Sequence, residues 1–251
     1  MYVIQPTCFP ANHHIMEALV IIDACRRASA KTITLVAPYY GYARQERKNS
    51  LRTPITAKLT AELFEAAGVD RVLTMELHNS AIQGFFRIPV DHLFATPIFY
   101  ECIKVPQNTD KFVVVSPDAG GVERARALAK KYQAGLAIID KRRDRPNESS
   151  VMHIIGDVRD AHCLIVDDIV DTGGSLIKAA VALKEKGAVS VGAIASHGVL
   201  SFKATTRLQQ SIINEIIVTD TIPLHAKAQE CPKIRQISVA PLFAEAIRRI
   251  H

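Results

Sequence analysis

Short runs rich in valine and isoleucine alternate along the chain with segments whose apolar positions recur at helical spacing. Several of the runs are apolar at successive positions, which is typical of strands in a parallel sheet that helices cover on both faces. The pattern therefore predicts an α/β fold. Its strands are expected at residues 2–5, 32–40, 71–77, 111–118, 135–140, 163–168, 190–198 and 214–220.

Three helices have recognisable sequence signals. In residues 52–68, Thr53 is a plausible N-cap, Pro54 suits the first helical position and Gly68 follows the end. Residues 175–187 end in lysines and a glycine, and residues 241–251 form an amphipathic pattern that could dock on either half of the chain.

A domain boundary is expected near residues 94–102, because one series of strands and helices precedes this segment and another follows it. We therefore divide the chain into domains at residues 1–96 and 97–239, with residues 240–251 returning to complete the first domain. The 251 residues, 48% of them hydrophobic, suffice for two modest cores.

The net charge of +6 is spread along the chain, and no run of five basic residues occurs. This distribution favours small polyanionic ligands such as phosphates over nucleic acid. The five cysteines lack metal-ligand spacing, which fits a reducing compartment. The sequence contains neither a leader pattern nor an apolar run long enough to span a bilayer, so we expect a cytoplasmic protein without membrane contact.

The segment "VDDIVDTGGS" carries the strongest chemical signal. Glycines between a strand and a helix allow backbone N–H groups to bind a phosphate. Because carboxylates repel phosphate, Asp167 and Asp168 are expected to face sugar hydroxyls or a water-bound Mg²⁺. A sugar phosphate satisfies both requirements. The alternative is a tight turn in which Asp171 or Thr172 serves only as N-cap.

Two further strand ends carry acidic or histidine side chains. "SPDAGG" suits a metal-bridged phosphate at Asp118, and otherwise is an ordinary Asp-Gly turn. "MELHNS" places Glu76 and His78 two residues apart, so both can face the same side of a strand. His78 then either contacts a ligand or has a structural role.

Two basic segments also follow predicted strands. "YGYARQERK" offers aromatic rings and donors for a nucleotide, among them Arg44 and Gln45. "DKRRDRPNESS" contains Lys141 and Arg143 in a polar loop that would suit phosphoryl transfer. Taken alone, each segment is equally explained as a solvated loop.

In this order, "YARQERK", "SPDAGG", "AIIDKRR", "VDDIVDTGGS", "HGVLS" and "KIRQISVAPLFAEAIRRIH" closely resemble the ribose-phosphate diphosphokinase family over essentially the whole chain. The resemblance implies two phosphoribosyltransferase-like domains, each a mainly parallel sheet flanked by helices. It implies diphosphoryl transfer from Mg-ATP to the C1 hydroxyl of ribose 5-phosphate, for nucleotide biosynthesis, and a dimer-based homo-oligomer, commonly a hexamer.

The same resemblance assigns roles to residues. Arg44, Gln45 and His78 would bind ATP, and His78 and Asp118 would serve the magnesium ion. Lys141 and Arg143 would be catalytic. The ribose 5-phosphate site would consist of Asp167, Asp168, Asp171, Thr172, Gly173, Gly174 and Ser175.

The chain departs from the family pattern in three places. Glu46 replaces the usual residue of "YARQDRK", and Glu76, Asn79, Ser80 and Ala81 replace usual residues near His78, so metal or nucleotide geometry there is expected to differ. After "HGVLS", the usual "SGPA"-like sequence is replaced by Phe202, Lys203 and Ala204. Family members also carry elements before the segment matched by residues 2–8, including a loop that contacts adenine. We therefore expect a weakly active or inactive synthase with an intact ribose 5-phosphate pocket.

Two alternatives remain open at this point. A type I phosphoribosyltransferase would use the same "DDIVDTGG" site with a diphosphate substrate and a nucleobase. A non-catalytic synthase-associated subunit would keep the fold while lacking the chemistry.

Overall fold

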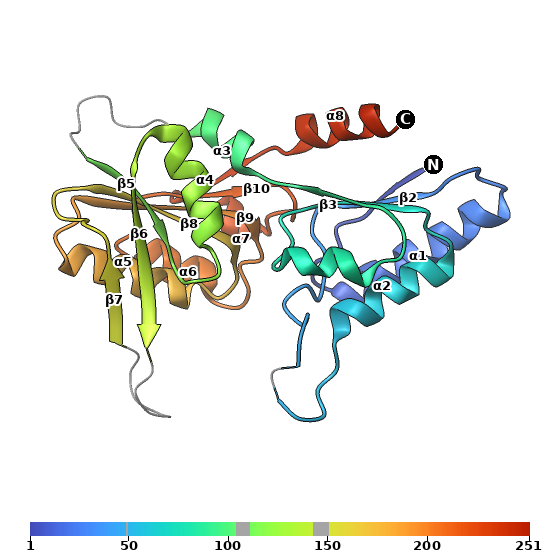
Figure 1. Ribbon diagram of the computed structural model, residues 1–251, viewed down its shortest axis with the longest axis horizontal. Coiled ribbons are helices and arrows are strands. Elements are labelled where there is room, and N and C mark those ends of the chain that lie inside the picture. Colours follow the sequence, from blue (N-terminus) through green and yellow to red (C-terminus); the bar gives the residue numbers. More distant parts are fainter. Residues whose placement is uncertain (49, 104–110, 143–150) are drawn as a thin grey trace. The chain divides into compact units, whose positions relative to one another are not determined.

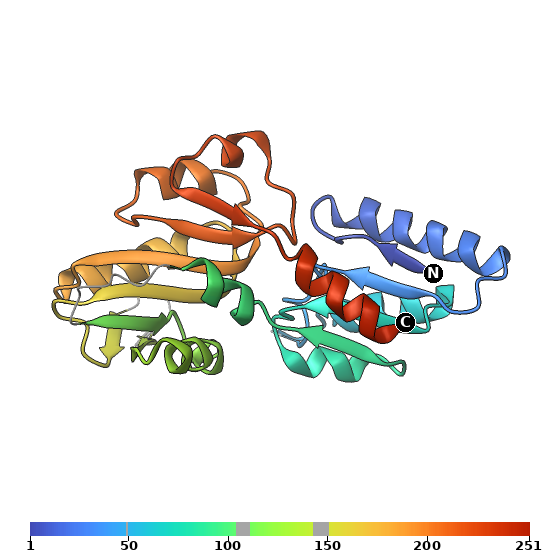
Figure 2. The same cartoon turned by 90° about the horizontal axis from the view of Figure 1, so that it is seen from above.

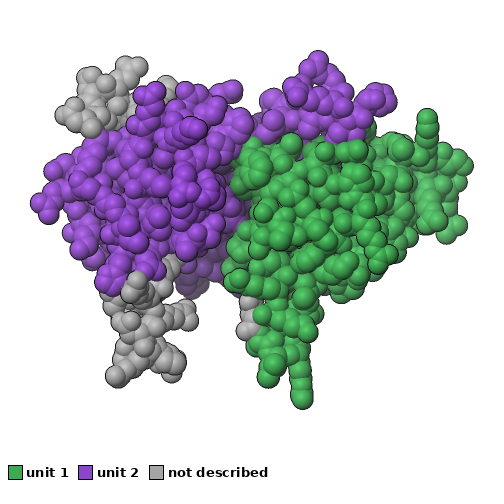
Figure 3. Space-filling model, in the orientation of Figure 1, with its two compact units in different colours: residues 1–95 green, residues 96–251 purple. Residues whose placement is uncertain are grey.

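The computed structural model describes residues 1–48, 50–103, 111–142 and 151–251 (Figure 1). It divides into two compact units, residues 1–95 and residues 96–251 (Figure 3). Each unit contains its own sheet and hydrophobic core.

Unit 1 is a four-stranded parallel sheet with strand order β1-β2-β3-β4. Helices α1 and α2 pack against each other and cover one face of this sheet (Figure 1). Ile22 of α1 and Phe64 of α2 are fully buried against strand residues such as Leu35. The elements are β1 (Tyr2–Ile4), α1 (Ala11–Arg27), β2 (Thr34–Ala37), α2 (Thr56–Ala67), β3 (Arg71–Met75), the 3-10 helix η1 (Ser80–Phe85) and β4 (Val90–Leu93).

Unit 2 is a seven-stranded sheet with strand order β11-β10-β9-β8-β5-β6-β7, parallel except for the β6–β7 pair. From above, the sheet runs from red-orange β11 through orange and yellow strands to green β5 (Figure 2). Its elements are α3 (Thr96–Cys102), β5 (Phe112–Ser116), α4 (Val122–Tyr132), β6 (Gly135–Arg142), β7 (Val151–Ile155), β8 (His162–Val170), α5 (Gly174–Glu185), β9 (Ser190–Gly198), α6 (Ala204–Gln210), β10 (Ile216–Thr219), α7 (Ala226–Gln229), β11 (Ile234–Ile237) and α8 (Ala240–Ile250).

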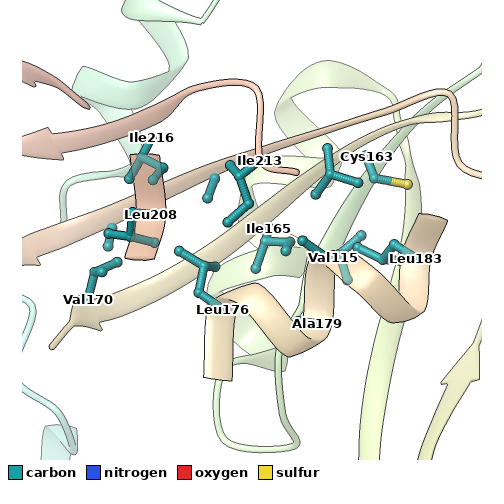
Figure 4. Close-up of a cluster of buried hydrophobic side chains, with 14 of the residues drawn as sticks. Val115, Cys163, Ile165, Val170, Leu176, Ala179, Leu183, Leu208, Ile213 and Ile216 are labelled. Carbon is teal, nitrogen blue, oxygen red and sulfur yellow. The ribbon is translucent and has the colours of Figure 1, made fainter. Parts of the chain in front are cut away.

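The core of unit 2 explains why its central strands are apolar at successive positions. Leu176 and Leu183 point from α5 toward Val115 and Ile165 on one face of the sheet (Figure 4). Successive side chains of a strand point to opposite faces, so the buried Leu164 belongs to the other face. With both faces buried, alternation of polar and apolar residues disappears, as expected for a parallel sheet.

The predicted α/β class is confirmed, and each predicted strand overlaps an observed one. The predicted start of the helix in residues 52–68 is wrong. Helix α2 begins at Thr56 after the N-cap Ile55, and the hydroxyl of Thr53 donates instead to the carbonyl of Ser50, at 2.8 Å, within the preceding turn. Gly68 ends the helix in the left-handed conformation, with φ of 109°, as its position predicts.

The two units meet in the sequence between Ala95 and Thr96, and helix α8 is grouped with unit 2. The proposed return of residues 240–251 to the first domain stays a prediction. Strands β4, β7 and β11 were not predicted. The segments "VDHL" of β4 and "IRQI" of β11 contain few apolar residues, whereas "VMHII" of β7 is mostly apolar and was missed.

Substituting Leu183 tests the α5 packing. Leu183 is fully buried, so Leu183→Ala should lower the free energy of unfolding by about 2–5 kcal/mol through lost burial and a residual cavity. Val181 lies on the same helix and is 39% exposed, so Val181→Ala is the matched control and should change stability much less. Urea unfolding of both variants measures the difference, and equal losses would contradict this packing.

Candidate functional site

The carboxyl ends of β5 and β8 lie side by side at one edge of the unit 2 sheet. The two strands pair in parallel, with Val115 opposite Ile165. The turn that follows β5, residues 117–121, and the turn that follows β8, residues 171–173, therefore leave the sheet as neighbours. Ligands of open α/β sheets bind at such an edge. The topology thus brings the predicted residue Asp118 to the same edge as Asp167 and Asp168.

The turn between β8 and α5 has the geometry of an anion-binding helix start. Gly173 has φ of 73°, and an added Cβ would lie 3.0 Å from a methyl group of Leu208 on α6. The first backbone hydrogen bond of α5 runs from the N–H of Ile177 to the carbonyl of Gly173. The N–H groups before Ile177 therefore lack acceptors within the helix, and the helix dipole favours an anion there.

Helix α5 has no side-chain cap, because its N-cap is Gly173. The alternative interpretation of Asp171 or Thr172 as an N-cap is therefore wrong. Thr172 and Ser175 are exposed and Asp171 is half-buried, so hydroxyl and carboxylate groups surround the glycines of this turn.

Asp167, which is half-buried, and Asp168, which is buried, form an acidic pair at the end of β8. Asp168 is 6% exposed, and its backbone N–H donates to Oδ1 of Asp167 at 2.9 Å. The guanidinium of Arg124 lies nearby, with Nη1 3.9 Å from Oδ1 of Asp168. Burial, followed by the neighbouring carboxylates of Asp168 and Asp118, raises the pKa of Asp167 to about 8. Such a pair suits the hydroxyl donors of a sugar.

Asp118 combines a structural contact with an exposed carboxylate. Its Oδ1 accepts a hydrogen bond from the N–H of Gly121 at 3.0 Å, and its carbonyl accepts one from the hydroxyl of Ser116 at 2.7 Å. An added Cβ at Gly121 would lie 2.9 Å from that hydroxyl, so any larger residue would displace the Ser116 side chain. The turn is thus held together by Asp118, while its exposed carboxylate oxygens are of the kind that Mg²⁺ prefers.

In unit 1, the predicted residues follow the adjacent strands β2 and β3. Arg44 and Gln45 come after β2, His78 comes after β3, and all three side chains are exposed. The expectation that Glu76 and His78 face the same side is wrong. Glu76 has φ of 46°, so the strand alternation ends there, and its buried carboxylate accepts from the N–H of Ala95 at 2.9 Å.

The segment around His78 is held by contacts that were not predicted. Nε2 of His92 accepts from the N–H of Leu77 at 2.9 Å, directly before His78. The side chain of Asn79 accepts from the N–H of Ala81 and caps the helix η1. The unusual residues of this segment thus stabilise its turn. His92 gave no signal in the sequence because its partner is a backbone group fifteen residues away.

The remaining predicted residues are incompletely placed. Lys141 lies in β6, where only its backbone is described, and Arg143 lies outside the described residues. His78 belongs to unit 1 and Asp118 to unit 2, so their use of one ion stays a prediction.

Among the residues that the structure describes, no group of three histidine, cysteine or acidic side chains could hold a metal ion. The same part of the chain contains no helix able to cross a membrane.

Comparisons with known proteins agree with this architecture. Residues 1–68 match the family model described as the N-terminal domain of ribose phosphate pyrophosphokinase. Residues 143–251 match the model described as the phosphoribosyl synthetase-associated domain. The crystal structure of phosphoribosylpyrophosphate synthetase from Mycobacterium smegmatis superposes with a TM-score of 0.91 at 41% identity, covering 99% of this chain and 81% of that one.

Two curated relatives extend the match over the sequence. The ribose-phosphate pyrophosphokinase of Neisseria meningitidis serogroup A is 55% identical over 251 residues, which are 100% of this chain and 76% of that protein. The ribose-phosphate pyrophosphokinase of Agrobacterium fabrum is 54% identical over 249 residues, which are 99% of this chain and 80% of that protein. The fold is that of the phosphoribosyltransferase-like α/β class. Within that class, the chain belongs to the ribose-phosphate pyrophosphokinase family of enzymes.

The raised pKa of Asp167 predicts that stability depends on pH. The folded protein keeps the proton up to about pH 8, whereas the unfolded chain releases it near 3.8. The stabilisation is therefore complete below pH 3.8 and is lost as the pH rises through 8, by at most about 1.4 kcal/mol per pH unit.

Urea unfolding at several pH values between 5 and 9 measures this dependence. Asp167→Asn should flatten it, whereas Asp160→Asn, which alters an exposed carboxyl, should leave it unchanged. If Asp167→Asn kept the slope of the wild type, Asp167 would not be the group that titrates.

The glycine turn gives a second prediction. Gly173→Ala should lower the free energy of unfolding by about 1–3 kcal/mol, because the left-handed backbone and the Leu208 contact both oppose a Cβ. Gly174→Ala is the control, since the nearest atom to its Cβ is 3.8 Å away and the position is helical. Equal thermal stability of the two variants would show that neither the left-handed backbone nor the Leu208 contact opposes a Cβ at this position.

Proposed function

We propose that the chain transfers the diphosphoryl group of ATP to ribose 5-phosphate and gives 5-phosphoribosyl 1-diphosphate and AMP. The observation that carries this proposal is the juxtaposition of the glycine turns that follow the neighbouring strands β5 and β8 with the Asp167–Asp168 pair at the end of β8. A phosphate, a diol and a second phosphate group fit these three features. Membership of the ribose-phosphate pyrophosphokinase family supports the same reaction.

In this proposal the turn between β8 and α5 binds the 5-phosphate. The backbone N–H groups of Gly174 and Ser175 start α5 and face an anion, and the side chains of Asp171 and Thr172 lie in the same turn. Asp167 and Asp168 accept hydrogen bonds from the ribose hydroxyls. The sugar is thereby oriented with its C1 hydroxyl toward the turn at Asp118, which follows the adjacent strand.

The transfer itself conserves atoms and electrons. The C1 oxygen attacks the β-phosphorus of ATP, the bond from that phosphorus to the bridging oxygen of the α-phosphate breaks, and AMP leaves with the bonding electrons. The hydroxyl proton passes to water. Bound Mg²⁺ would neutralise charge on the polyphosphate, and the exposed carboxylate of Asp118, together with His78, would hold it.

The remaining predicted residues complete the proposed site. Arg44 and Gln45 follow β2 with exposed side chains, and their N–H groups would donate hydrogen bonds to ATP. Lys141 and Arg143 would stabilise the charge that develops on the transferring group, since phosphoryl transfer depends mainly on positioning and electrostatics. We further propose that the protein acts in the cytoplasm as a dimer-based homo-oligomer.

The test is the release of AMP from ATP and Mg²⁺, measured with and without ribose 5-phosphate on the purified chain. We expect AMP that depends on the sugar phosphate, and a loss of at least about tenfold in kcat/KM for Asp168→Asn, because the diol then lacks a charged acceptor. The surface variant Asp160→Asn should behave as the wild type.

The other outcomes separate the competing functions. Consumption of 5-phosphoribosyl 1-diphosphate with a nucleobase, in the absence of ATP, would identify a phosphoribosyltransferase. Protection against thermal unfolding by ribose 5-phosphate without any AMP release would identify a binding subunit that lacks the chemistry.

A further inference from the structure

The segment between β9 and α6 contains a strained turn. The N–H of Ala204 donates to the carbonyl of Ser201 at 3.0 Å, which makes Phe202 and Lys203 the two central residues of the turn. Phe202 has φ of 55° and Lys203 has φ of −94°. A positive φ followed by a negative φ is typical of a type II′ turn, whose first central position favours glycine. A phenylalanine at this position therefore opposes the local backbone preference.

The packing of the fold does not compensate for this strain. A left-handed backbone is unfavourable for a residue with a Cβ. Leu200 also has a positive φ, of 50°, but its side chain is 2% exposed and belongs to the core of unit 2. Phe202 is 95% exposed, so its ring gains almost nothing from burial. A single exposed phenylalanine needs no explanation by itself, but one held in a conformation suited to glycine indicates a functional role.

Backbone contacts hold the strained turn next to the turn between β8 and α5. The N–H of Ser201 donates to the carbonyl of Asp171 at 3.1 Å. Helix α6, which follows the strained turn, approaches the same place, since a methyl group of Leu208 lies 3.0 Å from the position of a Cβ on Gly173. Phe202 is therefore held at the rim of the turn to which the proposed function assigns the 5-phosphate.

The groups that the proposed function assigns to the sugar phosphate are all polar. They are backbone N–H groups, hydroxyls and carboxylates, which serve the phosphate and the ribose hydroxyls. A sugar also has C–H groups, and ligand sites commonly cover such apolar surface with aromatic rings. Lys203 is exposed directly after Phe202, so the strained turn also offers a cation that attracts a phosphate. An aromatic ring beside a cation suits a sugar phosphate.

We propose that Phe202 covers the ribose 5-phosphate bound at the turn between β8 and α5, with its ring against the C–H groups of the sugar. This inference rests on the proposed function, because it concerns the same ligand and the same turn. The exposed ring is free to change its rotamer when the ligand binds. Burial against the sugar then supplies the stabilisation that the ring does not gain in the free protein.

The test measures ligand binding and stability of the full chain for two substitutions of Phe202. Phe202→Gly removes the ring and relieves the backbone, whereas Phe202→Ala removes the ring and keeps the unfavourable φ. Calorimetric titration with ribose 5-phosphate and Mg²⁺ should show binding about 5–20-fold weaker in both variants, as the loss of an apolar contact implies. Without ligand, the midpoint of thermal unfolding should rise by about 2–6 °C for Phe202→Gly and change by less than about 2 °C for Phe202→Ala.

Gln133→Gly is the matched control. Gln133 is exposed, has φ of 51° and follows the C-terminal end of α4, whereas the turn of residues 117–121 lies at the N-terminal end of that helix. Gln133→Gly should raise the unfolding midpoint in the same way and leave the affinity for ribose 5-phosphate unchanged. Phe202→Tyr keeps an aromatic ring and should bind ribose 5-phosphate within about threefold of the wild type.

Each result has a distinct meaning. Higher stability together with weaker binding in Phe202→Gly would support the proposal, because a purely structural role of Phe202 predicts the opposite change in stability. Unchanged affinity in both Phe202→Gly and Phe202→Ala would overturn it, and a simultaneous change in sedimentation would assign the ring to a contact between copies of the chain. Weaker binding in Phe202→Gly alone would also overturn it, since the flexibility of glycine would then be the cause.

The same measurements separate this proposal from the proposed function. If the wild type binds ribose 5-phosphate but releases no AMP, the proposed reaction fails, while weaker binding in both Phe202 variants still supports the role of the ring. A wild type that does not bind ribose 5-phosphate would overturn both proposals.

Discussion

The parallel pairing of β5 with β8 is the constraint on which the site depends. Each strand ends in a short turn with glycines, and each turn carries acidic side chains. Neither turn contains a complete site. The register that sets Val115 opposite Ile165 brings the two turns together. Burial of both strands between helices fixes that register, because a shift by one residue would turn the buried side chains to the other face of the sheet. The chemistry of the site is therefore a consequence of sheet packing.

The electrostatics of the site follow from the same packing. Three carboxylates near one sheet edge would repel one another if all were ionised. The structure limits this cost by raising the pKa of Asp167 and by placing the guanidinium of Arg124 beside Asp168. A buried charge is tolerated only where it is paired or neutralised. The acidic pair is thus prepared for a ligand that donates hydrogen bonds.

Much of the fold could be predicted because the buried strands are continuous apolar runs, which a single sequence displays directly. Helix starts were harder to predict. Thr53 has the composition of an N-cap, but its hydroxyl closes the preceding turn, so the helix begins at Thr56. Strands β4 and β11 were not predicted because they bury few residues. Burial depends on neighbouring elements that the local sequence does not specify.

The candidate site could be predicted where the chemistry is local and not where it depends on distant contacts. The glycine turns and the acidic pair lie within short motifs, and the structure places them at one edge. The buried orientation of Glu76 depends on its positive φ and on the N–H of Ala95, which the strand alternation could not reveal. His92 and Arg124 act through groups far away in the sequence, at Leu77 and Asp168.

The strand order also has a consequence for how the polypeptide folds. Strand β5 is followed in the sequence by α4, β6 and β7, yet its neighbour on the other side is β8. The β6–β7 pair and the packing of α4 on β5 involve residues close in sequence, whereas the β5–β8 pairing must close a loop of about fifty residues, which costs chain entropy and slows folding. Until that closure, one side of β5 remains an unpaired strand edge, which can pair with another chain. Pairing of β8 with β5 both protects this edge and brings together the two turns of the ligand site.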